Sequence, residues 1–360
     1  LLFAYNYFKK AEHVEAPGKD IARLSLAEHF FYLGNALYVL KKFEDSIKAY
    51  SISLELNEHA VAYYNRGNAY LELHEYAKAI KDFDKAIELS PNYAEAYNNR
   101  GVAYAELGEY KRAIKDYDKA IELNPDDAEA YYNRGIAYAR LGKYKRAIED
   151  YDRAIELNPN YAKAYIGRGL AYAERGEYNK AIKDFDKAIE LNHNLAEVYT
   201  GRGLAYAELG EYKRAIEDYN KAIELNPDDA KAYYNRGVAY AELGKYDRAR
   251  EDMLRAGNLF TNKRRMEDAV RACEVIFDIG EESERVIAGY ILLLHSYISR
   301  SDSANDIEEK LNEKGYMDEE VLRNAIEHLE RREESKWLIH IFSELRNVCN
   351  RMRDGGENHH

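Results

Sequence analysis

Six arginines recur along the chain at intervals of 34 residues, and an aspartate follows each of them 16 residues later. A ladder of arginines can bind phosphate, but arginine also forms paired hydrogen bonds with carboxylates. In the copy of this pattern that precedes Arg66 and Asp82, the equivalent positions hold Leu33 and Ala49, so both charges are absent together there. We therefore predict structural ion pairs, with anion binding as the alternative if no carboxylate lies within about 4 Å. The predicted pairs are Arg66–Asp82, Arg100–Asp116, Arg134–Asp150, Arg168–Asp184, Arg202–Asp218 and Arg236–Asp252.

No other set of reactive side chains has the spacing of a catalytic or metal site. The sequence contains no G-x-x-x-x-G-K-[ST], G-x-S-x-G or H-E-x-x-H motif. Its ten histidines are scattered, and its two cysteines, Cys273 and Cys349, lie far apart. We therefore expect no enzymatic activity, no cofactor and no metal.

The elements that position the arginines are defined by a repeat. Residues 94–127 and 128–161 are identical at 26 of 34 positions, and the same period marks glycines from Gly67 to Gly237. Self-similarity at such a period is typical of a solenoid of stacked units. The earliest unit, which starts at Ala27, is 33 residues long.

Each unit has the pattern of two helices joined by a short turn. With Ala94 as repeat position 1, small or apolar residues recur every three to four residues on either side of Leu107-Gly108. Glycine at that point can take the left-handed conformation that ends a helix. Asn124-Pro125 ends the second helix, because proline lacks an N–H and restricts the residue before it.

This pattern resembles the tetratricopeptide repeat (TPR) family. The family has an aromatic residue, glycine, an aromatic residue, alanine, an aromatic residue, alanine and proline at positions 4, 8, 11, 20, 24, 27 and 32. The residues here are Tyr97, Gly101, Tyr104, Ala113, Tyr117, Ala120 and Pro125. The resemblance covers seven repeats over about residues 27–263, and it implies an all-α fold, a right-handed TPR superhelical solenoid.

In the family, ligands lie in a concave groove lined by the first helix of each repeat. When the groove positions 5 and 9 of the family are carried over to this chain, the resemblance implies a groove that is rich in amides near its beginning and apolar beyond it. Its residues would be Tyr64, Asn68, Asn98, Val102, Tyr132, Ile136, Ile166, Leu170, Thr200, Leu204, Tyr234 and Val238. We expect Ile136, Ile166, Leu170 and Leu204 to be accessible to solvent unless a partner or the C-terminal segment covers them.

The resemblance implies a scaffold that binds a protein, as an extended peptide or a partner helix. Some family members clamp acidic chaperone tails with lysine, asparagine and arginine. The clamp is absent here, since its positions hold Phe31, Asn35, Asn65, Glu95 and Asn99. Two alternatives stay open: a regulatory module of a larger enzyme or effector whose catalytic domain lies upstream of Leu1, and a self-associating structural array.

The composition of the chain limits the classes of partner that it could bind. A net charge of −12 argues against nucleic acid and anionic membranes. Residues 303–332 loosely resemble a helix-turn-helix, but Asp318 and its two glutamate neighbours would repel phosphates. The longest apolar run, Val286–Leu294, is too short to span a bilayer. Two separated cysteines favour a reducing, cytoplasmic location.

The flanks are divided as follows. Residues 1–26 are predicted to hold a partial repeat helix, marked by Ala4, Phe8 and Ala11, and a linker, so we expect the protein to continue upstream. Residues 264–353 are predicted to form a helical cap or small helical domain, with N-caps at Ser303 and Asp318. We expect its first helix to pack on repeat seven and to shield it. Its expected core residues are Ile276, Phe277, Ile291, Leu294 and Trp337, and residues 354–360 are a predicted disordered tail or tag remnant.

Overall fold

A computed structural model describes residues 5, 6, 9, 19–299, 301 and 303–356. The described residues are helical throughout, apart from turns and short links, and include no strand. The fold is therefore all-α, as predicted. The predicted partial helix of residues 1–13 lies largely outside the described residues, as do Ala4, Phe8 and Ala11.

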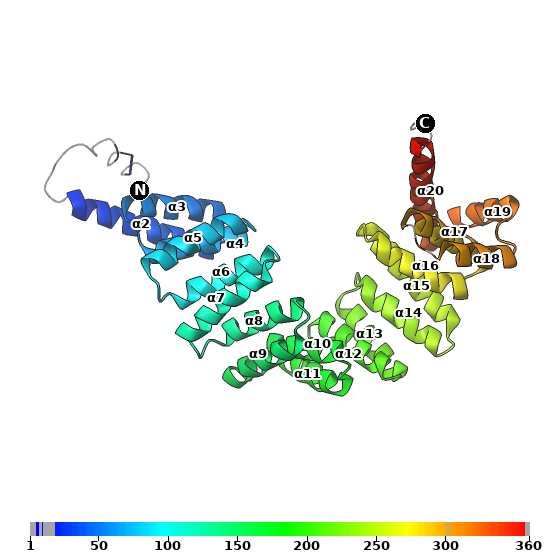
Figure 1. The fold of residues 1–360 in the computed structure, drawn as a ribbon, viewed down its shortest axis with the longest axis horizontal. Coiled ribbons are helices and arrows are strands. Elements are labelled where there is room, and N and C mark those ends of the chain that lie inside the picture. The colour runs from blue at the N-terminus through cyan, green and yellow to red at the C-terminus, as the bar shows by residue number, and fades with distance from the viewer. Residues whose placement is uncertain (1–4, 7–8, 10–18, 300, 302, 357–360) are drawn as a thin grey trace. The chain divides into compact units, whose positions relative to one another are not determined.

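The chain divides into two compact units, residues 1–175 and 176–360, and each is described by itself. The boundary falls inside repeat five, so the predicted array of residues 27–263 contributes to both units. Figure 1 shows the helices in chain order. Unit 1 contains α2 (Lys19–Val39), α3 (Phe43–Leu56), α4 (Ala60–Glu72), α5 (Tyr76–Leu89), α6 (Ala94–Glu106), α7 (Tyr110–Leu123), α8 (Ala128–Arg140), α9 (Tyr144–Leu157) and α10 (Ala162–Glu174).

Unit 2 begins with the second helix of repeat five and ends with the C-terminal segment. Its repeat helices are α11 (Tyr178–Leu191), α12 (Ala196–Glu208), α13 (Tyr212–Leu225), α14 (Ala230–Glu242) and α15 (Tyr246–Asn262). The C-terminal segment contains α16 (Met266–Ile279), α17 (Glu282–Ser299), α18 (Ala304–Glu313), α19 (Glu319–Glu330), the 3-10 turn η1 (Glu333–Ser335) and α20 (Lys336–Gly356). Because α20 extends to Gly356, the predicted tail is helical at its beginning, and residues 357–360 lie outside the described part.

A repeat that lies within one unit is an antiparallel helical hairpin, as α6 and α7 illustrate (Figure 1). Gly108 has φ +77°, the left-handed conformation predicted for the turn. Gly101 lets the two helices approach, because a Cβ there would lie 2.6 Å from Cε1 of Tyr117. Ala113, Ala120 and the ring of Tyr117 are nearly inaccessible to solvent. Small residues and one aromatic ring thus form the interior of the repeat.

The turn between α15 and α16 has the geometry of a turn inside a repeat. Arg264 has φ +55°, and its equivalent in the preceding hairpin, Gly244, has φ +69°. Counting Arg250 as repeat position 1 also places Gly257 at position 8 and Ala269 at position 20. Helix α15 therefore serves twice, as the second helix of repeat seven and as the first helix of another TPR-like hairpin with α16.

The C-terminal segment covers this last hairpin. Met253, Phe260, Ile276, Ile291 and Trp337 are all at most 4% exposed and belong to one hydrophobic cluster. Phe277 is buried in the same cluster, and Leu294 is partly buried against it. The expected core residues thus pack together, and α16 shields repeat seven.

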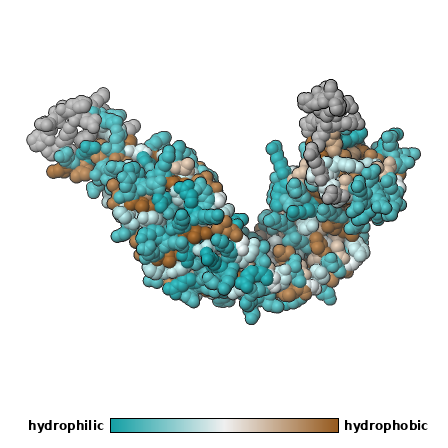
Figure 2. Space-filling view, in the orientation of Figure 1, coloured by the Kyte–Doolittle hydropathy of each residue, from teal (hydrophilic) through white to brown (hydrophobic). Residues whose placement is uncertain are grey.

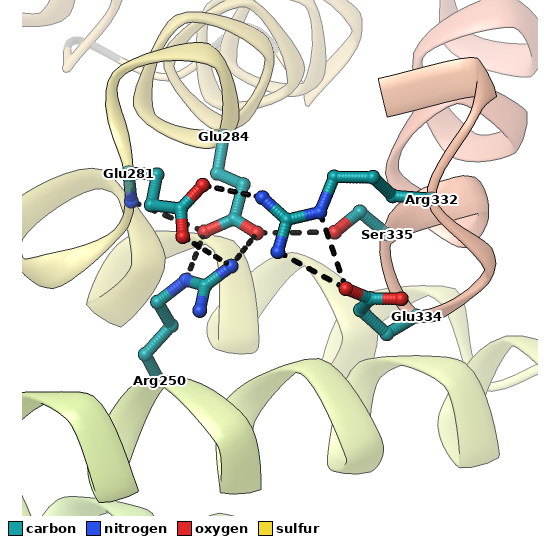
Figure 3. Close-up of polar contacts among 6 residues, drawn as sticks. All are labelled: Arg250, Glu281, Glu284, Arg332, Glu334 and Ser335. Carbon is teal, nitrogen blue, oxygen red and sulfur yellow. Dashed lines mark hydrogen bonds and ion pairs between the residues drawn. The ribbon is translucent and has the colours of Figure 1, made fainter. Parts of the chain in front are cut away.

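A polar cluster joins the last repeat to η1 (Figure 3). Arg250 on α15 donates from Nε and Nη2 to the two carboxylate oxygens of Glu284 at 2.6 and 2.7 Å. Glu284 is completely buried, and it also accepts from the Ser335 hydroxyl at 3.0 Å. Around this pair, Glu281 binds both Arg250 and Arg332. Three separate parts of the chain therefore meet at one buried carboxylate.

The two predicted N-caps differ. Asp318 accepts hydrogen bonds from the backbone N–H groups of Glu320 and Val321, so it caps α19. Ser303 stands at the N-cap position of α18, as predicted, but its side chain makes no capping hydrogen bond. The hydroxyl of Ser303 is instead hydrogen-bonded with the hydroxyls of Ser296 and Ser301, so it does not bind the backbone N–H groups of the first turn of α18.

Candidate peptide-binding surface

The first helices of the repeats turn one face to their own repeat and leave the opposite face accessible. In α4, Gly67 faces Phe83 of its own repeat, and Ala62 and Ala69 are buried as well. Repeat positions 5 and 9 lie away from that face, since helical neighbours three and four residues apart share one side. The candidate surface in unit 1 consists of these positions on α4, α6, α8 and α10.

The predicted groove residues have different exposures. Leu170 in unit 1 is 50% exposed, and Leu204 in unit 2 is 46% exposed. Asn98 is buried, with 5% exposure. The remaining residues are half-buried: Tyr64, Asn68, Val102, Tyr132, Ile136 and Ile166 in unit 1, and Thr200, Tyr234 and Val238 in unit 2. Aliphatic side chains are thus accessible on α10 and on α12 (Ala196–Glu208), each within its own unit.

Asparagine side chains link the first helices in unit 1. Asn99 Nδ2 donates to Asn68 Oδ1 at 2.8 Å, and Asn65 Nδ2 donates to Asn35 Oδ1 at 2.9 Å. Asn133 Nδ2 reaches Asn98 Oδ1 at 3.2 Å. Asn98 therefore connects neighbouring helices and is shielded from a ligand. The donors stand at repeat position 6, which the sequence reasoning overlooked, although asparagine recurs there in repeats two, three, four and seven.

Two tyrosines of the surface are fixed by other tyrosines. The ring centroids of Tyr64 and Tyr93 lie 4.8 Å apart, and those of Tyr132 and Tyr161 lie 5.0 Å apart. Burial is the main cause of the raised pKa of Tyr64, and the nearby carboxylates of Glu95 and Glu129 raise it further. These tyrosines therefore present fixed rings beside negative charges.

A pocket of about 220 Å³ opens near the beginning of unit 1. Its lining is formed by Asn35, Tyr38, Val39, Tyr50, Asn65 and Asn68. Asn35 Oδ1 accepts from the Tyr50 hydroxyl at 2.7 Å as well as from Asn65. Nδ2 of Asn35 donates to no other group in the described part of the chain. The pocket thus combines aromatic rings with amide groups suited to a peptide backbone.

The arginine ladder lies on the seam between the two helices of each repeat. Arg100 donates from Nε and Nη2 to the two oxygens of Asp116, both at 2.7 Å. The equivalent two-bond pairs are Arg66–Asp82, Arg134–Asp150, Arg202–Asp218 and Arg236–Asp252. Their distances of 2.6 to 2.9 Å are far below the 4 Å limit of an ion pair. Arg168 and Asp184 belong to different units, and their pairing stays a prediction.

The third arm of each arginine reaches back to the preceding repeat. Arg100 Nη1 donates to Asp84 at 2.6 Å, Arg134 to Asp118 at 2.7 Å and Arg168 to Asp152 at 2.6 Å. Burial alone would lower the pKa of Arg134, but its hydrogen bonds with Asp150 and Asp118 raise it. Guanidinium groups held in this way are occupied by protein carboxylates, which argues against the phosphate alternative.

Models of the tetratricopeptide repeat family match most of the repeat array. The matched segments are residues 60–93, 83–115, 101–142, 128–161, 150–183, 169–210, 203–244 and 230–263. Together they run without a gap over residues 60–263, more than half of the chain. The chain therefore belongs to the TPR family.

Two curated relatives share short stretches with the chain. Hsp70-Hsp90 organizing protein 2 of Arabidopsis thaliana is 44% identical over 57 residues, which are 16% of this chain and 10% of the relative. The mitochondrial import receptor subunit TOM70 of Saccharomyces cerevisiae is 33% identical over 88 residues, which are 24% of this chain and 14% of the relative. The matches thus span only a small part of the length of these relatives.

Solved structures show the same fold. A TPR protein from Parabacteroides merdae has a TM-score of 0.56 at 22% identity, covering 69% of this chain and 98% of its own. The Cut9–Hcn1 structure has a TM-score of 0.55 at 20% identity, covering 74% and 51%. A TPR solenoid supports the role of a protein–protein interaction scaffold.

The described residues add two negative findings. They contain no group of three or more histidine, cysteine, aspartate or glutamate side chains that could hold a metal ion. Among the helices described, none combines the length and the apolar character needed to cross a membrane.

Proposed function

We propose that the first helices of unit 1 hold an extended segment of a partner protein. The observation that carries this proposal is the exposure of Leu170, at 50%, on the same helix as half-buried Ile166 and beside α8, which carries Ile136 and Tyr132. Apolar side chains gathered on an accessible face are typical of a binding site. The amide-lined pocket of about 220 Å³ near the beginning of the unit would receive the polar backbone of such a segment.

The charges around this surface favour a basic partner. On α4, α6, α8 and α10 the exposed residues at repeat positions 2 and 13 are mostly acidic: Glu72, Glu95, Glu106, Glu129 and Glu174, with Val61, Arg140 and Lys163 as exceptions. The effect of Glu95 and Glu129 on the pKa of Tyr64 supports a negative potential at the surface. We therefore infer an apolar segment flanked by lysine or arginine.

Proteins that organise chaperones or receive imported proteins, as the names of the curated relatives state, handle protein partners. That supports a protein as the ligand in general. The acidic chaperone tails bound by some family members do not suit this surface. The positions of the clamp hold Phe31, Asn35, Asn65, Glu95 and Asn99.

The test uses two synthetic peptides with the same leucine-rich centre, one with lysine flanks and one with glutamate flanks. We expect the lysine peptide to bind, with an affinity that falls as salt is added. Leu170→Glu and Ile136→Glu should weaken this binding at least tenfold. Leu107→Glu is the matched control, because Leu107 is 46% exposed but stands at the turn after α6. Equal binding of both peptides, or equal loss in all three variants, would refute the proposal.

A further inference from the structure

The N-terminal helix α2 presents an apolar face that nothing in the described chain covers. Ile21 is 74% exposed, Leu24 50%, Tyr32 64% and Val39 78%. On a helix these residues fall on one side, together with Glu28 and Ala36. We call this set, Ile21, Leu24, Glu28, Tyr32, Ala36 and Val39, the α2 face. Figure 2 shows hydrophobic surface at the end of the molecule where α2 begins.

Later repeats show what such a face is built to do. Ala36 at repeat position 10 is exposed, whereas its equivalents Ala69, Ala103 and Ala137 have no exposure. These alanines are buried where each first helix packs against the preceding repeat. Tyr32 stands at position 6, where Asn65 and Asn99 bind the preceding first helix. The α2 face thus has the position of an inter-repeat contact, and no residue that the structure describes packs on it.

The residues of the α2 face are self-complementary in an antiparallel arrangement. If two copies of α2 cross head to tail about a twofold axis near Phe30, Ile21 meets Val39 and Leu24 meets Ala36 of the second copy. Glu28 then meets Tyr32, whose hydroxyl can donate to the carboxylate. In the same arrangement, Asp20 at the start of α2 in one copy lies near Lys41 and Lys42, which follow the end of α2 in the other copy. Apolar groups and opposite charges therefore pair throughout the helix.

The other end of the repeat array offers no complementary open face. In unit 2, α16, α17 and α20 bury Met253, Leu254 and Phe260 of repeat seven. Stacking of one copy's first repeat on another copy's last repeat, which would make a filament, is therefore blocked. A face that can pair only with itself gives an isologous contact that closes at two copies.

We propose that the α2 face binds the α2 face of a second copy and forms a twofold symmetric dimer. The helix has 21 residues, so the contact is about 30 Å long. A contact along one helix is small compared with the roughly 1,200–2,000 Å² that specific complexes bury. The dimer is therefore reversible, and its population rises with protein concentration.

The experiment measures the mass of the full chain by light scattering over a range of concentrations. We expect a shift from monomer to dimer, and monomers at every concentration for Tyr32→Glu, which places a second carboxylate opposite Glu28. Leu89→Glu is the control, because Leu89 is 45% exposed on α5, away from the α2 face. Circular dichroism checks that each variant keeps its helices.

A second pair of variants tests the register. Ile21→Lys and Val39→Glu should each be monomeric, and a mixture of them should form dimers, because the introduced lysine of one copy meets the introduced carboxylate of the other. Three outcomes would overturn the proposal. They are a wild-type protein that stays monomeric, as it would if its own N-terminal residues covered the face, a dimer that survives Tyr32→Glu, and growth beyond two copies.

Discussion

The indole ring of Trp337 on α20 occupies the space in front of Gly257 on α15, so closely that any side chain at Gly257 would overlap it. In the regular repeats the same space before the glycine is filled by the aromatic residue of the second helix, as Tyr117 fills it before Gly101. The second helix α16 has Cys273 at that position. The C-terminal segment therefore supplies from α20 the ring that the last hairpin lacks.

This relationship predicts the effect of a single methyl group. Gly257→Ala should lower the free energy of unfolding by about 1–3 kcal/mol, because the buried indole has no room to move. Gly237→Ala is the matched control and should cost less, since its nearest neighbour is the flexible end of Met253, at 2.9 Å. Urea unfolding of both variants measures the difference. Equal losses would show that Trp337 is not a fixed part of the core.

Removal of the C-terminal segment should expose the last repeat. A chain ended after Asn262 loses the cover of Met253, Leu254, Leu259 and Phe260, which are at most 7% exposed in the full chain. We expect a lower melting temperature and concentration-dependent aggregation, because solenoid ends need a polar cap. A chain that lacks only residues 357–360 is the control. An unchanged melt of the shorter chain would mean that residues 264–353 are an independent domain.

The buried carboxylate of Glu284 should depend on Arg250, whose pKa it raises. Glu284→Gln removes the charge but keeps the shape, so Arg250 would retain Glu281 as its charged partner. The loss should be about 1–3 kcal/mol, because buried groups lose hydrogen bonds to the carboxylate while Arg250 keeps a charged partner. Removing both charges, with Arg250→Met added, should recover part of the loss. Glu282→Gln, at an exposed position of the same helix, is the control.

Thermal unfolding measures the loss of stability in these variants, and limited proteolysis measures whether the segment near η1 has become accessible. We expect the Glu284→Gln variant to be cut more readily near η1, because Ser335 is anchored to the same carboxylate at 3.0 Å. Cleavage at the wild-type rate, together with an unchanged melt, would contradict a role of Glu284 in holding α20.

The arginine ladder predicts a compensating pair of substitutions. Arg134→Leu should cost about 3–5 kcal/mol, since it leaves Asp150 charged at 6% exposure. Adding Asp150→Ala should recover part of this loss, because the first repeat has Leu33 and Ala49 at the same positions. Asp118→Ala removes only the half-exposed carboxylate that accepts from Nη1 of Arg134, and it should cost less than about 1 kcal/mol. A double variant no more stable than Arg134→Leu in chemical unfolding would argue against the pairing.

Alkaline pH should unfold the protein through its buried tyrosines. Burial raises the pKa of Tyr50 and Tyr63 to about 12, and it also raises the pKa of Tyr117, Tyr151 and Tyr219. In the unfolded chain these phenols ionise near pH 10. Their contribution to stability is therefore complete below pH 10 and is lost as the pH rises through about 12, because only the unfolded state has released the protons.

This dependence is measured by the melting temperature and the tyrosinate absorbance at increasing pH. We expect part of the absorbance to appear together with the loss of helical circular dichroism. Complete ionisation of the tyrosines in a chain that keeps its helices would contradict the prediction.

The sequence alone determined the repeat. A period of 34 residues, glycine at position 8 and proline at position 32 define where each helix of the repeat begins and ends, because these are local constraints on the backbone. The arginine and aspartate positions could also be paired in advance, since the geometry of a helical hairpin is the same in every copy. The cap of α19 by Asp318 belongs to the same class of local prediction.

Tertiary structure decided what happens at the ends of the array and between repeats. Nothing in the residue pattern indicated that Asn98 and Asn99 would bind neighbouring helices, because side-chain partners from other repeats are not encoded by spacing within one repeat. The 34-residue period ends near Lys263, yet α15 continues into a further hairpin, and Trp337 reaches Gly257 across 80 residues of chain. Such contacts depend on how separate helices pack, and packing complementarity between distant segments is a property of the folded chain alone.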